Sequence, residues 1–274
     1  VTDNVEGIVP EFLMMLRGVV DSPDIPLNVS RSYLQADGAV KKISSYITRK
    51  VADKLSSLFK NNREDFEAKW NDIKIVIEYG MLSEDKFFEK ADKFALYPTV
   101  DGKFFTFEEL QEKLKVNQTD KDNKLVILYA SDKEAQHSYI EAAKAKGYEV
   151  LLLDSPIISH LMQKLETSKE NISFTRVDAD HIDNLIKKDE TQISKLSDEE
   201  KETLKKELEE TIANKSYTIQ LEAMDSTASP FIITEPEFMR RMKEMQQTGG
   251  GGMFGMGSMP EMYNLIVNTN SELV

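Results

Sequence analysis

A strand, helix and strand pattern between residues 124 and 153 most constrains how this chain can fold. Residues 125–129 are a short continuous apolar run, residues 132–146 favour a helix ending at Gly147, and residues 149–153 are a second apolar run. Such runs are typical of parallel strands that are buried on both faces. We therefore predict a βαβ unit. A helix over 157–165 and a strand over 172–177 would complete a small three-layer α/β subdomain.

The loop after the first predicted strand is where such a unit would bind a nucleotide, because ligands of open α/β sheets bind at the carboxyl ends of strands. The loop reads Ala-Ser-Asp-Lys at 130–133. It lacks the spaced glycines that let a phosphate approach the backbone closely. We therefore expect the unit to serve as a scaffold.

Charge and composition exclude several classes of protein. With 35 Lys and Arg against 48 Asp and Glu, the net charge is −13, so we expect no nucleic-acid partner. The absence of cysteine excludes disulfides, thiol catalysis and thiolate metal sites, and fits a reducing cytosol. No run approaches the ~20 apolar residues that span a bilayer, and no leader opens the chain, so we expect a cytoplasmic protein without a membrane partner.

Histidines and acidic side chains give no sign of a metal site. His137, His160 and His181 are scattered, without paired spacing to carboxylates on one helical face. Three aspartates lie near His181, and we interpret that stretch as a solvated loop. They are Asp178, Asp180 and Asp183.

Residues 18–35 present a cation at the start of a helix. Pro23 and Pro26 hold the preceding backbone extended, which would deliver Arg31 at a helix N-terminus. A guanidinium beside unpaired N–H groups suits an anion. The alternative is structural: Ser32 and Gln35 fit a capping box, and Arg31 would then pair with a nearby acid.

The stretch VVDSPDIPLNVSRSYLQ resembles the middle-domain signature of the heat-shock protein 90 chaperone family, of the bacterial HtpG type. It departs from that pattern at Pro23, at Ile25 and at Ser32-Tyr33, all outside the functional polar positions. The resemblance implies that Arg31 contacts the γ-phosphate of ATP, which is bound with Mg mainly by a separate N-terminal domain, and that Gln35 and Asn28 support this arrangement. The fragment alone is therefore expected to have no ATPase activity.

The next segments continue the resemblance. Apolar residues from 40 to 59 recur every three or four positions and predict an amphipathic helix, whose opposite cationic face we expect to be solvated. Residues 61–115 are similar to the helical connector of the same chaperones. Here we expect Trp70 to lie in the core and Thr106 to form a capping box with Glu109.

Methionine is concentrated near the C-terminus, where eight of the twelve lie between 224 and 262. Methionine is flexible and polarizable, and a mobile Met surface can adapt to varied apolar shapes. We favour an exposed client-binding surface over ordinary core, and the resemblance implies the same for unfolded or partly folded client proteins. Its predicted residues are Phe238, Met239, Met242, Met245, Met253, Phe254 and Met256.

We predict α/β and α+β architecture in four parts. By the resemblance, residues 1–60 end a large middle subdomain, 61–115 are the helical connector, 116–190 are the small three-layer α/β subdomain, and 191–274 are an incomplete α+β C-terminal domain. Alternating apolar residues predict a strand over 216–223, residues 230–234 begin another short segment, and Ser197 and Glu200 should form a capping box. Residues 262–268 resemble the strand that precedes the final dimerisation helices of the same chaperones.

The resemblance implies an ATP-dependent chaperone that works as a full-length homodimer, with this fragment monomeric or weakly associated. A rival is a stand-alone α/β enzyme or anion-binding module that uses Arg31 with a carboxylate such as Asp154. Tight binding of small phosphates by the isolated chain would favour that rival. A passive interaction scaffold without ATP coupling is the third possibility.

Overall fold

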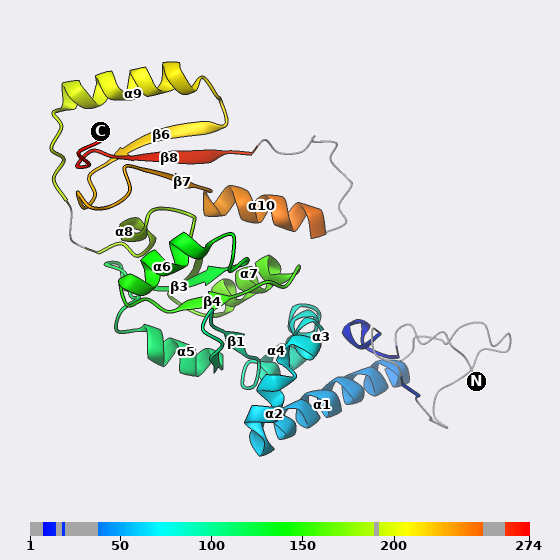
Figure 1. Cartoon of the computed structure of the whole chain (residues 1–274). Coiled ribbons are helices and arrows are strands. Elements are labelled where there is room, and N and C mark those ends of the chain that lie inside the picture. Colours follow the sequence, from blue (N-terminus) through cyan, green and yellow to red (C-terminus); the bar gives the residue numbers. More distant parts are fainter. Residues whose placement is uncertain (1–7, 15–17, 20–37, 189–191, 249–260) are drawn as a thin grey trace. The chain divides into compact units, whose positions relative to one another are not determined.

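The computed structural model describes residues 8–14, 18–19, 38–188, 192–248 and 261–274 (Figure 1). The chain divides into two compact units. Unit 1 comprises Val1–Tyr97 and Phe104–Leu110, and unit 2 comprises Pro98–Lys103 and Gln111–Val274. In chain order, the elements up to residue 114 are η1 (Glu11–Leu13), α1 (Gly38–Asn61), α2 (Arg63–Ala68), α3 (Trp70–Ser83), α4 (Asp85–Ala91), β1 (Tyr97–Pro98), β2 (Phe104–Phe105) and α5 (Phe107–Leu114).

Unit 1 is helical, and aromatic side chains fill its core. The amphipathic helix predicted over 40–59 is confirmed as α1, and Trp70 is buried as expected. The ring of Phe66 contacts the rings of Trp70 and Phe94, with centroids 6.2 Å apart in both pairs. The capping box is also confirmed, since the Thr106 backbone N–H donates to Glu109 Oε2 at 2.9 Å.

Unit 2 begins with an α/β lobe, which confirms the predicted βαβ pattern. Its elements are β3 (Leu125–Ala130), α6 (His137–Ala145), β4 (Val150–Leu152), α7 (Ile158–Ser168), β5 (Ile172–Arg176) and α8 (Ile182–Leu185). The sheet order is β4-β3-β5 and both pairings are parallel, with Leu128 opposite Val150 and Ile127 opposite Phe174.

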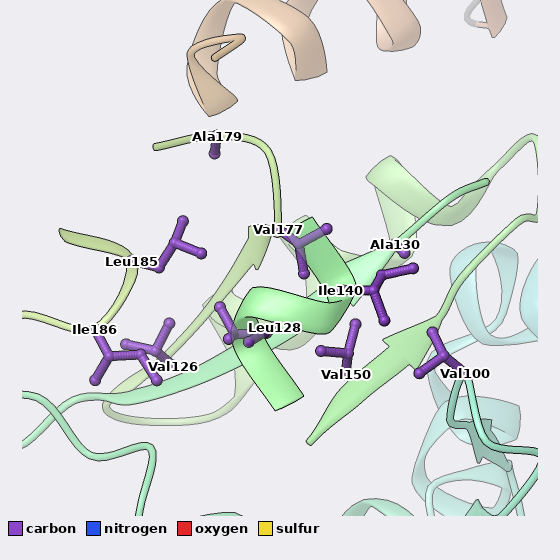
Figure 2. Packing of buried hydrophobic residues seen from close by; sticks show 11 residues of the cluster. Val100, Val126, Leu128, Ala130, Ile140, Val150, Val177, Ala179, Leu185 and Ile186 are labelled. Atoms are coloured by element: carbon purple, nitrogen blue, oxygen red, sulfur yellow. The ribbon is translucent and has the colours of Figure 1, made fainter. Parts of the chain in front are cut away.

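The central strand β3 is buried along its whole length, because helices cover both faces of the sheet. Val126, Leu128 and Ala130 pack against α6 and α8 through Ile140 and Leu185 (Figure 2). Alternate residues of a strand point to opposite faces, so Ile127 and Tyr129 face the other side, where α7 packs against β5. The predicted three-layer arrangement is confirmed.

Helix α6 begins five residues later than the predicted start at 132. Asp132 Oδ1 accepts hydrogen bonds from the backbone N–H groups of Glu134 at 2.9 Å and Ala135 at 3.0 Å. Aspartate favours such local turns over helix interiors, because its carboxylate offers the backbone a competing acceptor.

The rest of unit 2 is a three-stranded sheet with two helices. Its elements are α9 (Asp198–Ile212), β6 (Tyr217–Glu222), β7 (Phe231–Thr234), α10 (Glu237–Thr248) and β8 (Tyr263–Asn268). The order is β6-β8-β7, with β6 parallel and β7 antiparallel to β8. The strands expected over 216–223 and 262–268 and the Ser197–Glu200 capping box are confirmed. Helix α9 packs on β6 (Figure 1).

The solvated loop predicted around His181 is wrong for Asp178 and Asp180, which are half-buried, whereas Asp183 is exposed. Asp178 Oδ2 accepts a hydrogen bond from Arg176 Nη2 at 2.9 Å, and Asp180 Oδ1 accepts one from the backbone N–H of His181 at 2.7 Å. His181 is only 3% exposed and caps α8 by accepting from the Asp183 N–H through Nδ1. Burial raises the pKa of Asp180. These side chains hold the turn between β5 and α8 in place.

Candidate functional site

Helix α10 rests on the α/β lobe through its charged side and turns apolar residues outward. Arg240 is its one buried residue, at 4% exposed, whereas Phe238 is 71% exposed. Met242 is also exposed, and Met239 and Met245 are half-buried. This is the reverse of an ordinary amphipathic helix, whose apolar stripe faces the core. We call Phe238, Met239, Met242 and Met245 the α10 apolar face.

Glu237 is the centre of the charged side. Its Oε1 accepts hydrogen bonds from Tyr129 Oη at 2.9 Å and from Arg240 Nη2 and Arg241 Nε at 2.6 Å each. Its Oε2 accepts from the backbone N–H of Arg176 at 2.9 Å. Burial alone would raise the pKa of Glu237, but the charges of Arg240 and Arg241 hold that pKa below its usual value.

Arg241 and Glu244 of α10 contact α7 and β5. Arg241 donates to Glu166 Oε2 at 2.8 Å and to the Phe174 carbonyl oxygen at 2.6 Å. The Ser159 hydroxyl donates to Glu244. We call this set of contacts the α10 ion network; its residues are Tyr129, Ser159, Glu166, Arg176, Glu237, Arg240, Arg241 and Glu244.

The segment leading into α10 is tied to the same lobe. Arg176 Nη2 donates to Glu235 Oε2 at 2.6 Å, and the Glu235 backbone N–H donates to the Asp178 carbonyl oxygen at 3.0 Å. The start of α10 and its charged side are thus both held by β5 and the turn after it. The position of the helix is set by the lobe.

Tyr129 joins the lobe's sheet to the helix. Its ring is fully buried, its hydroxyl contacts both Glu237 and Arg240, and the Arg240 guanidinium lies 5.5 Å from the ring centroid. Burial, and next the negative charge of Glu237, raise the pKa of this phenol, so it is a neutral hydrogen-bond donor.

Further apolar side chains are exposed on the strands next to α10. Phe231 and Ile233 of β7 are each 47% exposed, and Met262, just before β8, is 39% exposed. A set of exposed apolar residues on adjacent elements is typical of an interaction surface. Aromatic and thioether side chains can also pack against the apolar side chains that an unfolded polypeptide exposes.

The predicted site residues divide into two groups. Phe238, Met239, Met242 and Met245 share one helix, α10. The other predicted site residues, Asn28, Arg31, Gln35, Met253, Phe254 and Met256, lie outside the described residues.

The ion network was not predicted from the sequence. A signal for it exists, because Glu237, Arg240, Arg241 and Glu244 are spaced i, i+3, i+4 and i+7, which places them on one helical face. Their partners in β3, β5 and α7 are distant in sequence, and no local pattern reveals them.

Two backbone N–H groups just after the carboxyl end of β3 are bound by a side chain of the same lobe. Gln136 Oε1 accepts the backbone N–H groups of Ser131 at 2.8 Å and Asp132 at 3.0 Å, and Gln136 is 5% exposed. These N–H groups are the ones that would otherwise be available to an anion at this edge. Both N–H groups are therefore taken by Gln136 and are not free to bind an anion.

Neither a metal centre nor a membrane span is found among the described residues. Within the described ranges, no cluster of three or more His, Asp or Glu side chains is arranged to hold a metal ion. None of the helices in the same ranges combines the length and apolar character needed to span a bilayer.

Comparisons with known proteins identify the family. The family model described as Hsp90 protein matches residues 1–261. Chaperone protein htpG of Bacteroides fragilis (strain YCH46) is 51% identical over 277 residues, covering 100% of this chain and 40% of that relative. Chaperone protein HtpG of Porphyromonas gingivalis (strain ATCC 33277) is 49% identical with the same coverage.

More distant relatives match over part of the chain. Chaperone protein HtpG of Alcanivorax borkumensis is 33% identical over 175 residues, or 62% of this chain. The chain spans about 40% of the length of the Bacteroides and Porphyromonas relatives. These matches confirm the resemblance seen in the sequence, and the chain belongs to the Hsp90 protein family.

Proposed function

We propose that this chain is part of an ATP-dependent molecular chaperone and that the α10 apolar face binds unfolded or partly folded client proteins. The observation that carries the proposal is that α10 buries its charged side and leaves Phe238 71% exposed. A soluble protein gains stability by burying such a ring, so its exposure calls for a functional explanation.

Methionine suits this role because clients differ in shape. Its unbranched side chain repacks at little cost, so one surface can contact many apolar sequences. The four residues of the α10 apolar face include three methionines. Names of the relatives agree with the proposal, since each is called a chaperone protein.

The ATP part of the proposal rests on the sequence resemblance alone. In it, Arg31 contacts the γ-phosphate of ATP that is bound with Mg by another domain of the full-length protein, and Gln35 and Asn28 support Arg31. The full-length protein would be a cytoplasmic homodimer, and the present chain by itself would be inactive as an ATPase.

Client binding is tested by replacing the two most exposed residues of the α10 apolar face. Phe238→Ser with Met242→Ser should weaken binding of fluorescein-labelled casein, an unstructured probe, about tenfold or more by anisotropy. The matched control is Val116→Ser with Ile193→Ser, which removes two apolar side chains that are 78% and 89% exposed elsewhere in the chain. Equal losses in both variants, or no loss in the first, would contradict the proposal.

The role of Arg31 is tested in the full-length protein. Arg31→Ala should lower ATP turnover at least tenfold while ATP still binds, because the charge on the γ-phosphate would lose a partner. Arg49→Ala, which removes an exposed cation of α1, is the control and should leave turnover unchanged. Unchanged turnover in Arg31→Ala would refute the assigned role.

A further inference from the structure

Helix α10 has an apolar face and a charged face, and either one could pack against the α/β lobe. At 100° per residue, the centres of its apolar and charged faces lie roughly 130° apart around the helix axis. A helix that rolled by that amount would bury Phe238, Met242 and Met245 against α7. The observed helix instead buries Arg240 and exposes Phe238.

Burial energetics favour the rolled arrangement. Removing aromatic and thioether surface from water is favourable, whereas burying charges is costly unless each one is paired. The observed packing also leaves one polar group unsatisfied, because Arg240 Nε is buried without a hydrogen-bond partner in the described part of the chain. The packing of the charged side on the lobe is therefore explained better by the orientation that it gives α10 than by the stability that it adds.

Directional contacts fix the roll of a helix in a way that apolar packing does not. Glu237 must lie within hydrogen-bond reach of both the Tyr129 hydroxyl and the Arg176 N–H, at 2.9 Å each. Arg241 must at the same time reach Glu166 on α7 and the Phe174 carbonyl on β5. A roll of 130° would break all four contacts and leave lobe groups buried without partners.

We propose that the α10 ion network is a roll lock, which keeps the α10 apolar face in solvent by penalising the arrangement that would bury it. Its residues are positioning residues: they set the direction of the surface without belonging to it. Three of these residues, Tyr129, Glu166 and Arg176, belong to the α/β lobe, so the lobe sets the orientation of the α10 apolar face. That the lock also sets client affinity rests on the proposed function; the orientation itself does not.

The chain has no cysteine, so a single introduced thiol reports exposure directly. With Phe238→Cys as the reporter, the rate of reaction with an aromatic disulfide reagent measures the exposure of the α10 apolar face. Replacing the charges with apolar residues of similar size, Glu237→Leu, Arg240→Met and Glu244→Leu together, should slow that reaction at least tenfold. The helix should stay docked, because apolar replacements of buried ion networks are tolerated.

Two matched variants separate rolling from general damage. Lys243→Met removes a cation of the same helix whose partner, Glu261, is exposed, and it should leave the reporter rate unchanged. Ala143→Cys, in place of the α10 reporter, puts a thiol at a fully buried position of α6 and should stay unreactive with and without the triple replacement if the α/β lobe is folded. If the triple variant does not pass this folding control, Tyr129→Phe is tested in its place. This variant removes one hydroxyl of the network and should slow the reaction of the Phe238→Cys thiol at least twofold.

The proposal is overturned if Phe238→Cys reacts as fast in the folded triple variant as in the parent, or as fast in Tyr129→Phe when that variant is needed. Casein binding by the triple variant without the reporter separates this result from the proposed function. A slowed thiol with weakened casein binding supports both proposals. A slowed thiol with unchanged casein affinity supports the roll lock and removes α10 as the client surface.

Discussion

The rings of Phe12 and Phe87 meet with their centroids 4.7 Å apart, and Gly80 of α3 lies against both. A Cβ atom at position 80 would lie 2.8 Å from Phe12 Cδ2 and 2.8 Å from Phe87 Cδ1. Both rings are fully buried. This glycine therefore sets how closely η1 and α4 approach α3.

Gly80→Ala is expected to destabilise unit 1 by about 1–3 kcal/mol, because the overpacking cost exceeds the gain in helix propensity of about 1 kcal/mol. Urea unfolding followed by the fluorescence of Trp70, the chain's one tryptophan, measures this. Asn71→Ala, at an exposed position of the same helix, is the control and should lie within about 0.5 kcal/mol of the parent. A stabilised Gly80→Ala variant would show that the rings can move apart freely.

Glu109 couples the start of α5 to α2. Its carboxylate accepts hydrogen bonds from Arg63 Nη2 at 2.8 Å and from the Thr106 backbone N–H at 2.9 Å. The Arg63 hydrogen bond is the main cause that lowers the pKa of Glu109, and the Thr106 hydrogen bond adds to it. The folded state therefore binds the Glu109 proton more weakly than the unfolded state does.

The sign of the pH dependence follows from that lowered pKa. The stabilisation is present above the unfolded pKa of Glu109 and is lost as the pH falls through the folded one. Glu109→Gln should cost about 1 kcal/mol at pH 7, a value reduced for the partial exposure of both side chains. Trp70-detected unfolding at pH 7 and near pH 3 should show the gap between parent and variant closing at low pH. A gap that is independent of pH would exclude the ion pair as its cause.

Gln136 is expected to stabilise the α/β lobe through one side-chain oxygen that satisfies two backbone N–H groups. Gln136→Met leaves the Ser131 and Asp132 N–H groups without this acceptor and should cost about 2 kcal/mol. Circular dichroism during urea unfolding measures the loss. Gln163→Met, at an exposed position of α7, should change stability by less than about 0.5 kcal/mol. Similar values for the two variants would mean that water replaces the Gln136 oxygen at no cost.

Local patterns predicted most of the fold of unit 2. Continuous apolar runs gave β3 and β4, alternation gave β6, and the spacing of Ser197 and Glu200 gave the start of α9. Each of these signals lies within a few residues of sequence, where propensity and capping act. The late start of α6 was missed because a single aspartate turn outweighed the helix propensity of residues 132–136.

The candidate site was predicted only in part. The exposed apolar residues of α10 were expected from the concentration of methionine and from the resemblance. The role of its charged side depends on Tyr129, Glu166 and Arg176, which lie 61 to 111 residues away in sequence. The same holds around His181, whose acidic neighbours resembled a solvated loop. A charged residue has the same local signature in water and in a buried pair, so tertiary contacts decide between the two.

The pair formed by Glu166 and Arg241 should be energetically coupled. Their side chains are 24% and 13% exposed and meet at 2.8 Å. In a double-mutant cycle, Glu166→Gln retains an acceptor for the Phe174 N–H while losing the charge, and Arg241→Met retains the alkyl stem. We expect a coupling energy of about 1–3 kcal/mol from urea unfolding followed by circular dichroism.

The exposed pair of Lys243 and Glu261, also anchored on α10, provides the comparison cycle. Solvent screens these two side chains, so Lys243→Met with Glu261→Gln should give a coupling below about 0.5 kcal/mol. Because both cycles use the same helix, any general fraying of α10 would raise the two values together. Equal coupling in the two cycles would mean that burial against α7 adds nothing, and that the charged side of α10 is not what holds the helix on the α/β lobe.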